Sequence, residues 1–169
     1  AANGFCMRNI NPLDYSLKTL PNLAAGHLAI AHDAQGICRA MTEGPVGGGH
    51  AIGQAFRMIA DGDLDVALCG GADALLEELL FASYVGAGVL APDGADQPGA
   101  RPGEGSGVVV LEEAARARAR GAGIHGEVRG FSIASGEGEL APSDDPERLG
   151  KRLCRVIESV LDESGAFPD

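Results

Sequence analysis

Residues 44–73 read GPVGGGHAIGQAFRMIADGDLDVALCGGAD, in which a glycine-rich turn is followed by a helix pattern and then by a strand pattern. Apolar residues recur at three- and four-residue spacing over residues 52–59, which predicts an amphipathic helix with one buried face. The sequence DGD at residues 61–63 is expected to end this helix. Residues 65–69, DVALC, are a short apolar run ended by two glycines, which predicts a strand buried on both faces.

The alternation of helices and strands continues on both sides of this stretch. Before it, residues 24–31 predict a short helix and residues 37–41 predict a buried strand. After it, residues 107–111, GVVVL, carry the strongest strand signal in the chain. They lead into residues 112–120, which are rich in good helix formers and end at Gly121. This order indicates an α/β protein.

The last quarter of the chain contains the clearest helix. Asp145 is expected to act as its N-cap and Pro146 to occupy its first position, and one apolar stripe runs from there up to Gly165. Residues 124–134 predict a bent strand, because alternation is interrupted by two glycines. We expect residues 91–102 to form a flexible loop and residues 135–145 a polar loop.

Composition limits the classes of protein that fit. With 169 residues and 45% hydrophobic side chains, the chain is long enough for one cored domain, and 26 glycines with only 4% aromatic residues describe a glycine-rich α/β protein. A net charge of −11 argues against DNA or RNA as the ligand. No apolar run reaches the length of a spanning helix, so we expect no membrane partner.

Reactive side chains are present but are not arranged in metal motifs. Four widely separated cysteines, without a CxxC pair, predict reduced thiols and a cytoplasmic protein; they are Cys6, Cys38, Cys69 and Cys154. Four histidines, none in an HxxxH or HExxH pattern, give no indication of a metal site; they are His27, His32, His50 and His125. The glycine turns at 44–49 and 103–107 match no nucleotide-binding fingerprint, so no cofactor is expected.

Four blocks of the chain, in their order and spacing, resemble the β-ketoacyl synthase (condensing enzyme) family of the thiolase fold. They are PNLAAGHL (21–28), GGGHAIGQA (47–55), IADGDLDV with GGAD (59–66 and 70–73) and GEGSGVVVLEE (103–113). The resemblance implies a five-layered α-β-α-β-α fold of two similar halves, a dimer, and decarboxylative condensation of malonyl units carried by acyl carrier protein. Residues 1–169 resemble part of the N-terminal half only, as a single partial domain, and we expect a fragment.

The resemblance also points to a departure at the catalytic position. In the family, the nucleophilic cysteine lies in a turn five residues before the position of His50, which corresponds to Pro45 here. A proline ring offers no nucleophile and no N–H, although it suits the first turn of a helix. We therefore expect no catalytic residue. The loop between Leu90 and Gly103 is shorter than in the family, and Tyr84 is a candidate wall of an acyl pocket, with a plain core tyrosine as the alternative.

A ketosynthase scaffold without its nucleophile is similar to that of the chain-length-factor subunits of polyketide systems. This implies a non-catalytic subunit that pairs with an active ketosynthase, or with itself, interacts with acyl carrier protein and shapes the acyl tunnel. The pairing surface is expected around the 50–60 helix and the 65–69 strand. Two alternatives stay open: a fragment of an active 3-oxoacyl-ACP synthase, with a cysteine such as Cys38 displaced into the turn, and a structural remnant or binding module without condensing activity.

Overall fold

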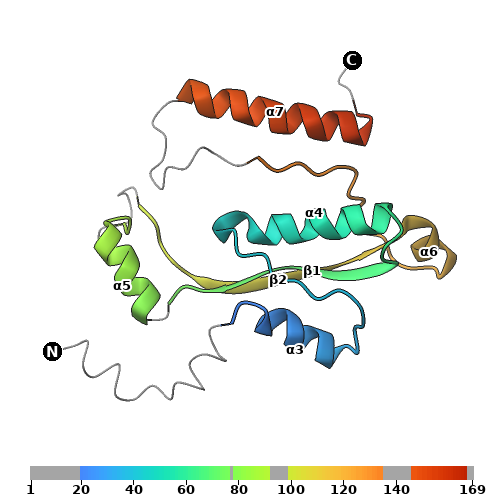
Figure 1. The fold of residues 1–169 in the computed structure, drawn as a ribbon, viewed down its shortest axis with the longest axis horizontal. Helices are drawn as coiled ribbons and strands as arrows, with labels where there is room; N and C mark the ends of the chain where they lie inside the picture. The colour runs from blue at the N-terminus through green and yellow to red at the C-terminus, as the bar shows by residue number, and fades with distance from the viewer. Residues whose placement is uncertain (1–19, 77, 92–98, 135–145, 167–169) are drawn as a thin grey trace. The chain divides into compact units, whose positions relative to one another are not determined.

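A computed structural model describes residues 20–76, 78–91, 99–134 and 146–166 (Figure 1). The chain divides into two compact units, residues 1–47 and residues 48–169. The predicted polar loop at 135–145 and most of the predicted flexible loop at 91–102 lie outside the described residues. Within the described ranges, no helix combines the length and apolarity that crossing a membrane requires.

The first unit contains helix α3 (Leu23–Ala31), which confirms the predicted helix, and the 3₁₀ turn η1 (Gly44–Val46). The helix ends where the N–H of His32 donates to the carbonyl of Leu28 at 3.1 Å. The strand predicted over residues 37–41 is wrong, because this segment is irregular. An apolar run becomes a strand only where a neighbour completes its hydrogen-bond ladder, and the described part of this unit contains no such neighbour.

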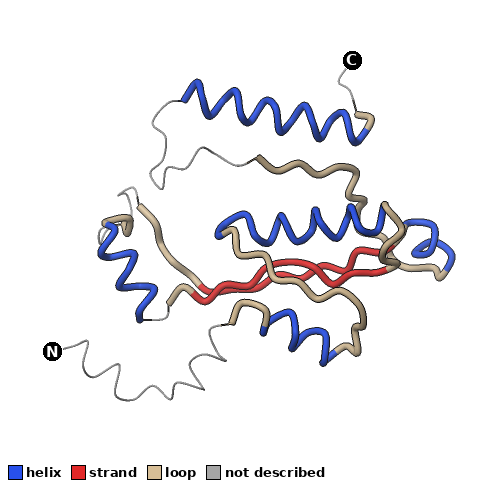
Figure 2. The backbone as a smooth tube through the Cα atoms, viewed as in Figure 1, coloured by secondary structure: helices blue, strands red, loops and turns tan. Residues whose placement is uncertain are grey.

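The second unit is built on a two-stranded antiparallel sheet, drawn as the paired red strands in Figure 2. Strand β1 (Val66–Ala74) pairs with β2 (Glu104–Glu112), so that Val66 lies opposite Glu112. The strands predicted at 65–69 and 107–111 are confirmed, and both are longer than expected. The glycines after Cys69 do not end β1, because the ladder uses backbone groups and continues through them to Ala74.

Helix α4 (Gly47–Ala60), which confirms the predicted amphipathic helix, packs against the sheet face that carries Cys69 and Gly71. Cys69 is only 8% exposed. The opposite face is open, since side chains at every second position of both strands are 38–60% exposed; they are Val66, Leu68, Val108 and Val110. The prediction that residues 65–69 are buried on both faces is therefore wrong for this chain.

Helix α5 (Glu78–Ala87) follows β1, and the sequence analysis did not identify it. Its residues are apolar on all sides, so no helical period stands out. The helix ends before Gly88. Further along the chain, Leu90 and Ala100 form an isolated bridge, in which the N–H of Ala91 donates to the carbonyl of Ala100 at 3.0 Å. This bridge closes the loop directly before β2.

Two further helices complete the second unit. Helix α6 (Ala114–Ala119) confirms the helix expected after β2, and α7 (Pro146–Ser164) confirms the last one. Between them, residues 124–134 form no strand, so the predicted bent strand is wrong in this structure. The backbone groups of Phe131 in this segment are hydrogen-bonded by side chains of α4 and α7 instead of by a neighbouring strand.

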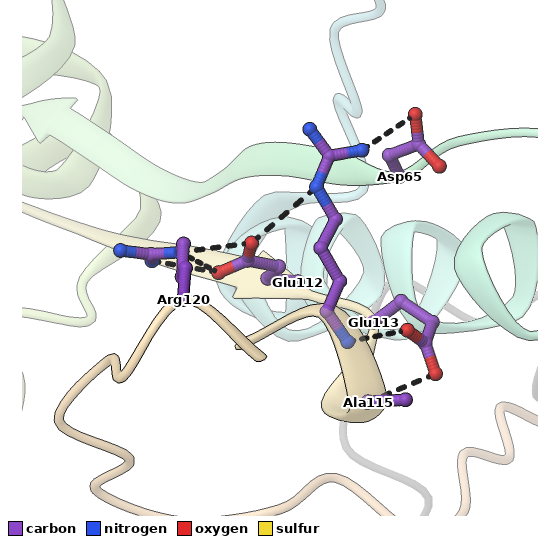
Figure 3. Close-up of polar contacts among 6 residues, drawn as sticks. Asp65, Glu112, Glu113, Ala115 and Arg120 are labelled. Carbon is purple, nitrogen blue, oxygen red and sulfur yellow. Dashed lines mark hydrogen bonds and ion pairs between the residues drawn. The ribbon is translucent and has the colours of Figure 1, made fainter. Parts of the chain in front are cut away.

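A group of charged side chains ties the end of β2 to α6 and to the start of β1 (Figure 3). Arg120 donates to both carboxylate oxygens of Glu112, with distances of 2.7–3.0 Å. Arg116 approaches the same carboxylate at 3.6 Å and pairs with Asp65 at 2.9 Å. The hydrogen bond from Arg120, followed by the positive charges of both arginines, holds the pKa of Glu112 below its ordinary value.

We expect the open face of the sheet to bind an apolar dye. Contiguous apolar surface on an isolated soluble chain promotes dye binding and self-association. The double variant Val108→Thr/Val110→Thr should therefore reduce 8-anilinonaphthalene-1-sulfonate fluorescence relative to the unchanged chain, with matching far-ultraviolet circular dichroism. Equal fluorescence from the two proteins would show that this face does not account for the dye signal.

The Glu112 carboxylate should make stability depend on pH. Because its pKa is lowered by folding, its contribution is fully present above the unfolded value of about 4.3 and is lost as the pH falls through the folded value. Glu112→Gln should thus lower the urea midpoint at neutral pH and flatten its fall below about pH 5. Glu127→Gln, at an exposed position in an irregular segment, serves as the control. Parallel pH curves for the Glu112 variant and the unchanged chain would contradict this prediction.

Candidate functional site

The candidate site lies at the start of α4, where the sequence places Pro45. The 3₁₀ turn η1 immediately precedes α4 in the chain, and Pro45 lies at the start of η1. Gly44 has φ = +60°, a left-handed conformation that favours glycine, and its carbonyl accepts a hydrogen bond from the N–H of Gly47. A proline fits here because the missing N–H belongs to the unpaired groups of a first turn. The local geometry is thus that of a helix entry without a nucleophile.

Two glycines allow α4 to lie directly on β1. A Cβ added to Gly71 would stand 3.1 Å from the Cα of Gly48, and one added to Gly48 would stand 3.4 Å from the Cα of Gly71. The two backbones therefore touch with no side chain between them. This contact fixes the first turn of α4 against the strand that follows it in the sequence.

On its other side, α4 carries the ring of Phe131. The ring occupies the space that a side chain on Gly53 would need. It stacks on the imidazole of His50, with ring centroids 5.8 Å apart and planes 14° from parallel. Gln54 holds the same imidazole through a contact of 3.1 Å between its Nε2 and the Nε2 of His50.

The backbone of Phe131 is held by two opposite charges. The Nη2 of Arg57 donates to its carbonyl at 2.8 Å, and its N–H donates to the Oε2 of Glu163 at 2.7 Å. Arg57 and Glu163 also approach each other at 3.4 Å. Helix α4 is therefore attached to β1 through glycines on one side and to α7 through Phe131 on the other.

None of the three cysteines among the described residues lies in the turn η1. Cys69 is buried in β1, and burial raises the pKa of its thiol, which disfavours the reactive thiolate. Its Sγ lies 3.8 Å from the carbonyl oxygen of Val109. Cys38 is exposed in an irregular segment and Cys154 is exposed on α7. Cys6 lies outside the described residues.

The histidines are spread over different elements. His27 lies within α3, His32 follows its last residue, and His125 lies in the irregular segment after α6. Only His50 belongs to α4. In the described part of the chain, no three histidine, cysteine or acidic side chains are grouped so that they could hold a metal ion.

Tyr84 lies half-buried on α5, one residue after Ser83, whose hydroxyl donates to the carbonyl of Leu80 at 2.6 Å. Its assignment as a wall of an acyl pocket stays a prediction. In the glycine-rich stretch 103–107, residues 104–107 are the first residues of β2, and Gly105 lies opposite Asp73. This second glycine turn therefore forms part of the sheet and not a ligand loop.

Comparison with known proteins identifies the scaffold. The family described as "Beta-ketoacyl synthase, N-terminal domain" matches residues 4–117, which include the turn, α4 and both strands. The chain belongs to the β-ketoacyl synthase family. Its elements form part of the thiolase-like fold of ketosynthases.

Individual relatives extend the match beyond residue 117. The 3-oxoacyl-[acyl-carrier-protein] synthase 2 of Rhizobium meliloti (strain 1021) is 36% identical over 179 residues, which cover 96% of this chain and 42% of that protein. The chain therefore spans about two fifths of the length of this curated relative.

Solved ketosynthase structures share the same arrangement. One is a type II polyketide acyl carrier protein in complex with its ketosynthase bound to a hexaketide, with a TM-score of 0.75 and 26% identity. It covers 86% of this chain, which corresponds to 38% of that one. Another is the ishigamide ketosynthase/chain length factor, with a TM-score of 0.55 and 38% identity over 71% of this chain and 30% of that one.

Sequence reasoning did not identify the cluster around Phe131. Gly53 lies in the block GGGHAIGQA, but Arg57 and Glu163 belong to none of the four blocks, and Glu163 is separated from Arg57 by more than a hundred residues of chain. Local periodicity cannot detect such a contact. The available signal is a glycine inside a predicted helix, since such a glycine can indicate close approach by another group.

The contact between Gly48 and Gly71 predicts a large effect of adding a branched side chain. Gly71→Val should lower the free energy of unfolding by about 2 kcal/mol, because its methyl groups must push α4 off β1. Gly105→Val is the matched control, because no atom lies within 4 Å of a Cβ at this strand position. Urea unfolding followed by circular dichroism measures both. Equal stability of the two variants would show that the close approach is not maintained.

Proposed function

We propose that this chain is part of a non-catalytic ketosynthase-like subunit that pairs with an active ketosynthase and shapes its acyl tunnel. Pro45 at the entry of α4 carries this proposal. Formation of an acyl-enzyme thioester requires a thiolate that attacks the acyl carbonyl, and a proline ring has none. The scaffold around the position supports the proposal, since the glycine turn, α4 and β1 follow one another in the chain and α4 lies on β1 at Gly48 and Gly71.

Pairing is supported by the composition of one solved relative. The ishigamide structure is described as a ketosynthase/chain length factor, and this chain is 38% identical to the part it covers. We infer a catalytic ketosynthase as the partner, with a second copy of the chain as the alternative. The pairing surface is proposed around α4 and the first half of β1, as part of a dimer in the cytoplasm.

Acyl carrier protein is the proposed second partner. The hexaketide-bound relative is described as a complex of a ketosynthase with its acyl carrier protein. The proposed subunit would meet that carrier as part of the heterodimer, in fatty acid or polyketide biosynthesis. Within it, residues 1–169 form part of one N-terminal-type domain, and Tyr84 on α5 is proposed as a wall of the acyl tunnel.

Carrier-protein loading tests the assignment of Pro45. The subunit incubated with acyl and malonyl carrier proteins should acquire no acyl group, as measured by intact-protein mass spectrometry, whereas its catalytic partner should be loaded. Pro45→Ala should behave identically, because neither side chain is a nucleophile. Covalent loading of the unchanged chain would assign the nucleophile to another residue and favour an active synthase fragment.

Co-expression of the subunit, within its full reading frame, with a ketosynthase and a carrier protein tests the pairing. Size-exclusion chromatography should show a heterodimer, and Tyr84→Ala should shift the length of its products while Tyr84→Phe preserves it. A heterodimer with unchanged products would overturn the tunnel role of Tyr84. A subunit that stays alone would overturn pairing with a ketosynthase and favour a structural remnant.

A further inference from the structure

We propose that Glu163 on α7 is a positioning residue that acts through Phe131 on His50 in the first turn of α4. Glu163 and His50 are joined by contacts through Phe131, which lies between them in an irregular segment. The proposal concerns α4 itself and holds whether or not the protein pairs with a ketosynthase. Its failure is therefore distinguishable from failure of the proposed function.

The first step is the hold of Glu163 on the Phe131 backbone. Its Oε2 accepts the Phe131 N–H at 2.7 Å, and a hydrogen bond to a carboxylate is stronger than one between neutral groups. The ion pair between Glu163 and Arg57 spans 3.4 Å between partly exposed side chains, and such surface pairs contribute little. The main effect of Glu163 therefore passes through Phe131.

The second step is the fixed direction of the ring. The Arg57 guanidinium holds the Phe131 carbonyl at 2.8 Å, so both polar groups of this residue are bound by side chains. With its backbone held, the Phe131 ring enters the slot that Gly53 leaves on α4. In this slot the Phe131 ring lies against Gly53 and, one turn earlier in α4, against the imidazole of His50.

The third step is the orientation of His50. The Phe131 ring covers one face of the imidazole in a nearly parallel stack, with centroids within the range of aromatic pairs. Gln54 contacts the Nε2 of the same ring at 3.1 Å. Together these contacts set the direction of the imidazole, and the Phe131 contact depends on α7. A displacement of Glu163 should therefore change the exposure of His50.

Diethyl pyrocarbonate, which modifies imidazoles, measures this exposure when the labelled protein is read by peptide mass spectrometry. Glu163→Ala should raise the modification rate of His50 several-fold, while His27 and His32 in the first unit react as before. Glu163→Gln keeps a carbonyl oxygen that can accept the Phe131 N–H, so it should restore a rate close to that of the unchanged protein. Glu158→Ala, at an exposed position on the same helix, is the matched control.

Each outcome decides for or against the proposal. An unchanged His50 rate in Glu163→Ala, with a raised rate in Phe131→Leu, would show that Glu163 does not position the ring. Unchanged rates in both variants would show that the ring does not cover His50. A parallel rise at His27, His32 and His50 would report unfolding. In that case Glu163→Asp replaces Glu163→Ala as the test variant. It keeps the charge but is shorter by one methylene, and a selective rise at His50 is again the expected result.

Discussion

The antiparallel pairing of β1 with β2 is the constraint on which the second unit depends. It pairs residues 66–74 with residues 104–112. The connection that contains α5 therefore begins and ends at the same end of the strand pair, where Ala74 lies opposite Glu104. It also brings the end of β2 beside the start of β1, where Arg116 bridges Asp65 and Glu112. Without this ladder, α4 would lose the strand surface on which its first turn lies at Gly48.

Sequence patterns predicted α3, α4, α6, α7 and the centres of both strands. They failed where structure depends on a partner. Residues 37–41 and 124–134 have strand composition but pair with no strand among the described residues. Helix α5 was missed for a different reason, because an all-apolar helix has no face to detect. The resemblance identified the family, whereas the assignment of Pro45 to the nucleophile position stays a prediction. It did not identify the Phe131 cluster, whose members are distant in sequence.

The entry of α4 shows how chemistry and scaffold can be separated. A proline in the turn before α4 offers no nucleophile, and no hydrogen bond to its nitrogen is needed there. The contact that seats the helix lies a few residues further on, at Gly48, and does not involve the Pro45 side chain. A subunit can therefore lose thioester chemistry while it keeps the surface formed by α4 and β1. This separation is what a non-catalytic partner in a ketosynthase pair would require.

The glycine-rich, aromatic-poor composition can be related to close contacts that glycines make between elements, such as the one between Gly48 and Gly71. In the second unit, backbone approaches backbone at Gly48 with Gly71, and a ring approaches backbone at Gly53 with Phe131. In the described part of the chain no large side chain is fully buried, so few interior volumes exist for aromatic residues to fill. Glycine at such contacts is required by distance and not by backbone freedom, because any Cβ would separate the elements. For this reason the glycines of α4 indicate its neighbours on both sides more reliably than its hydrophobic residues do.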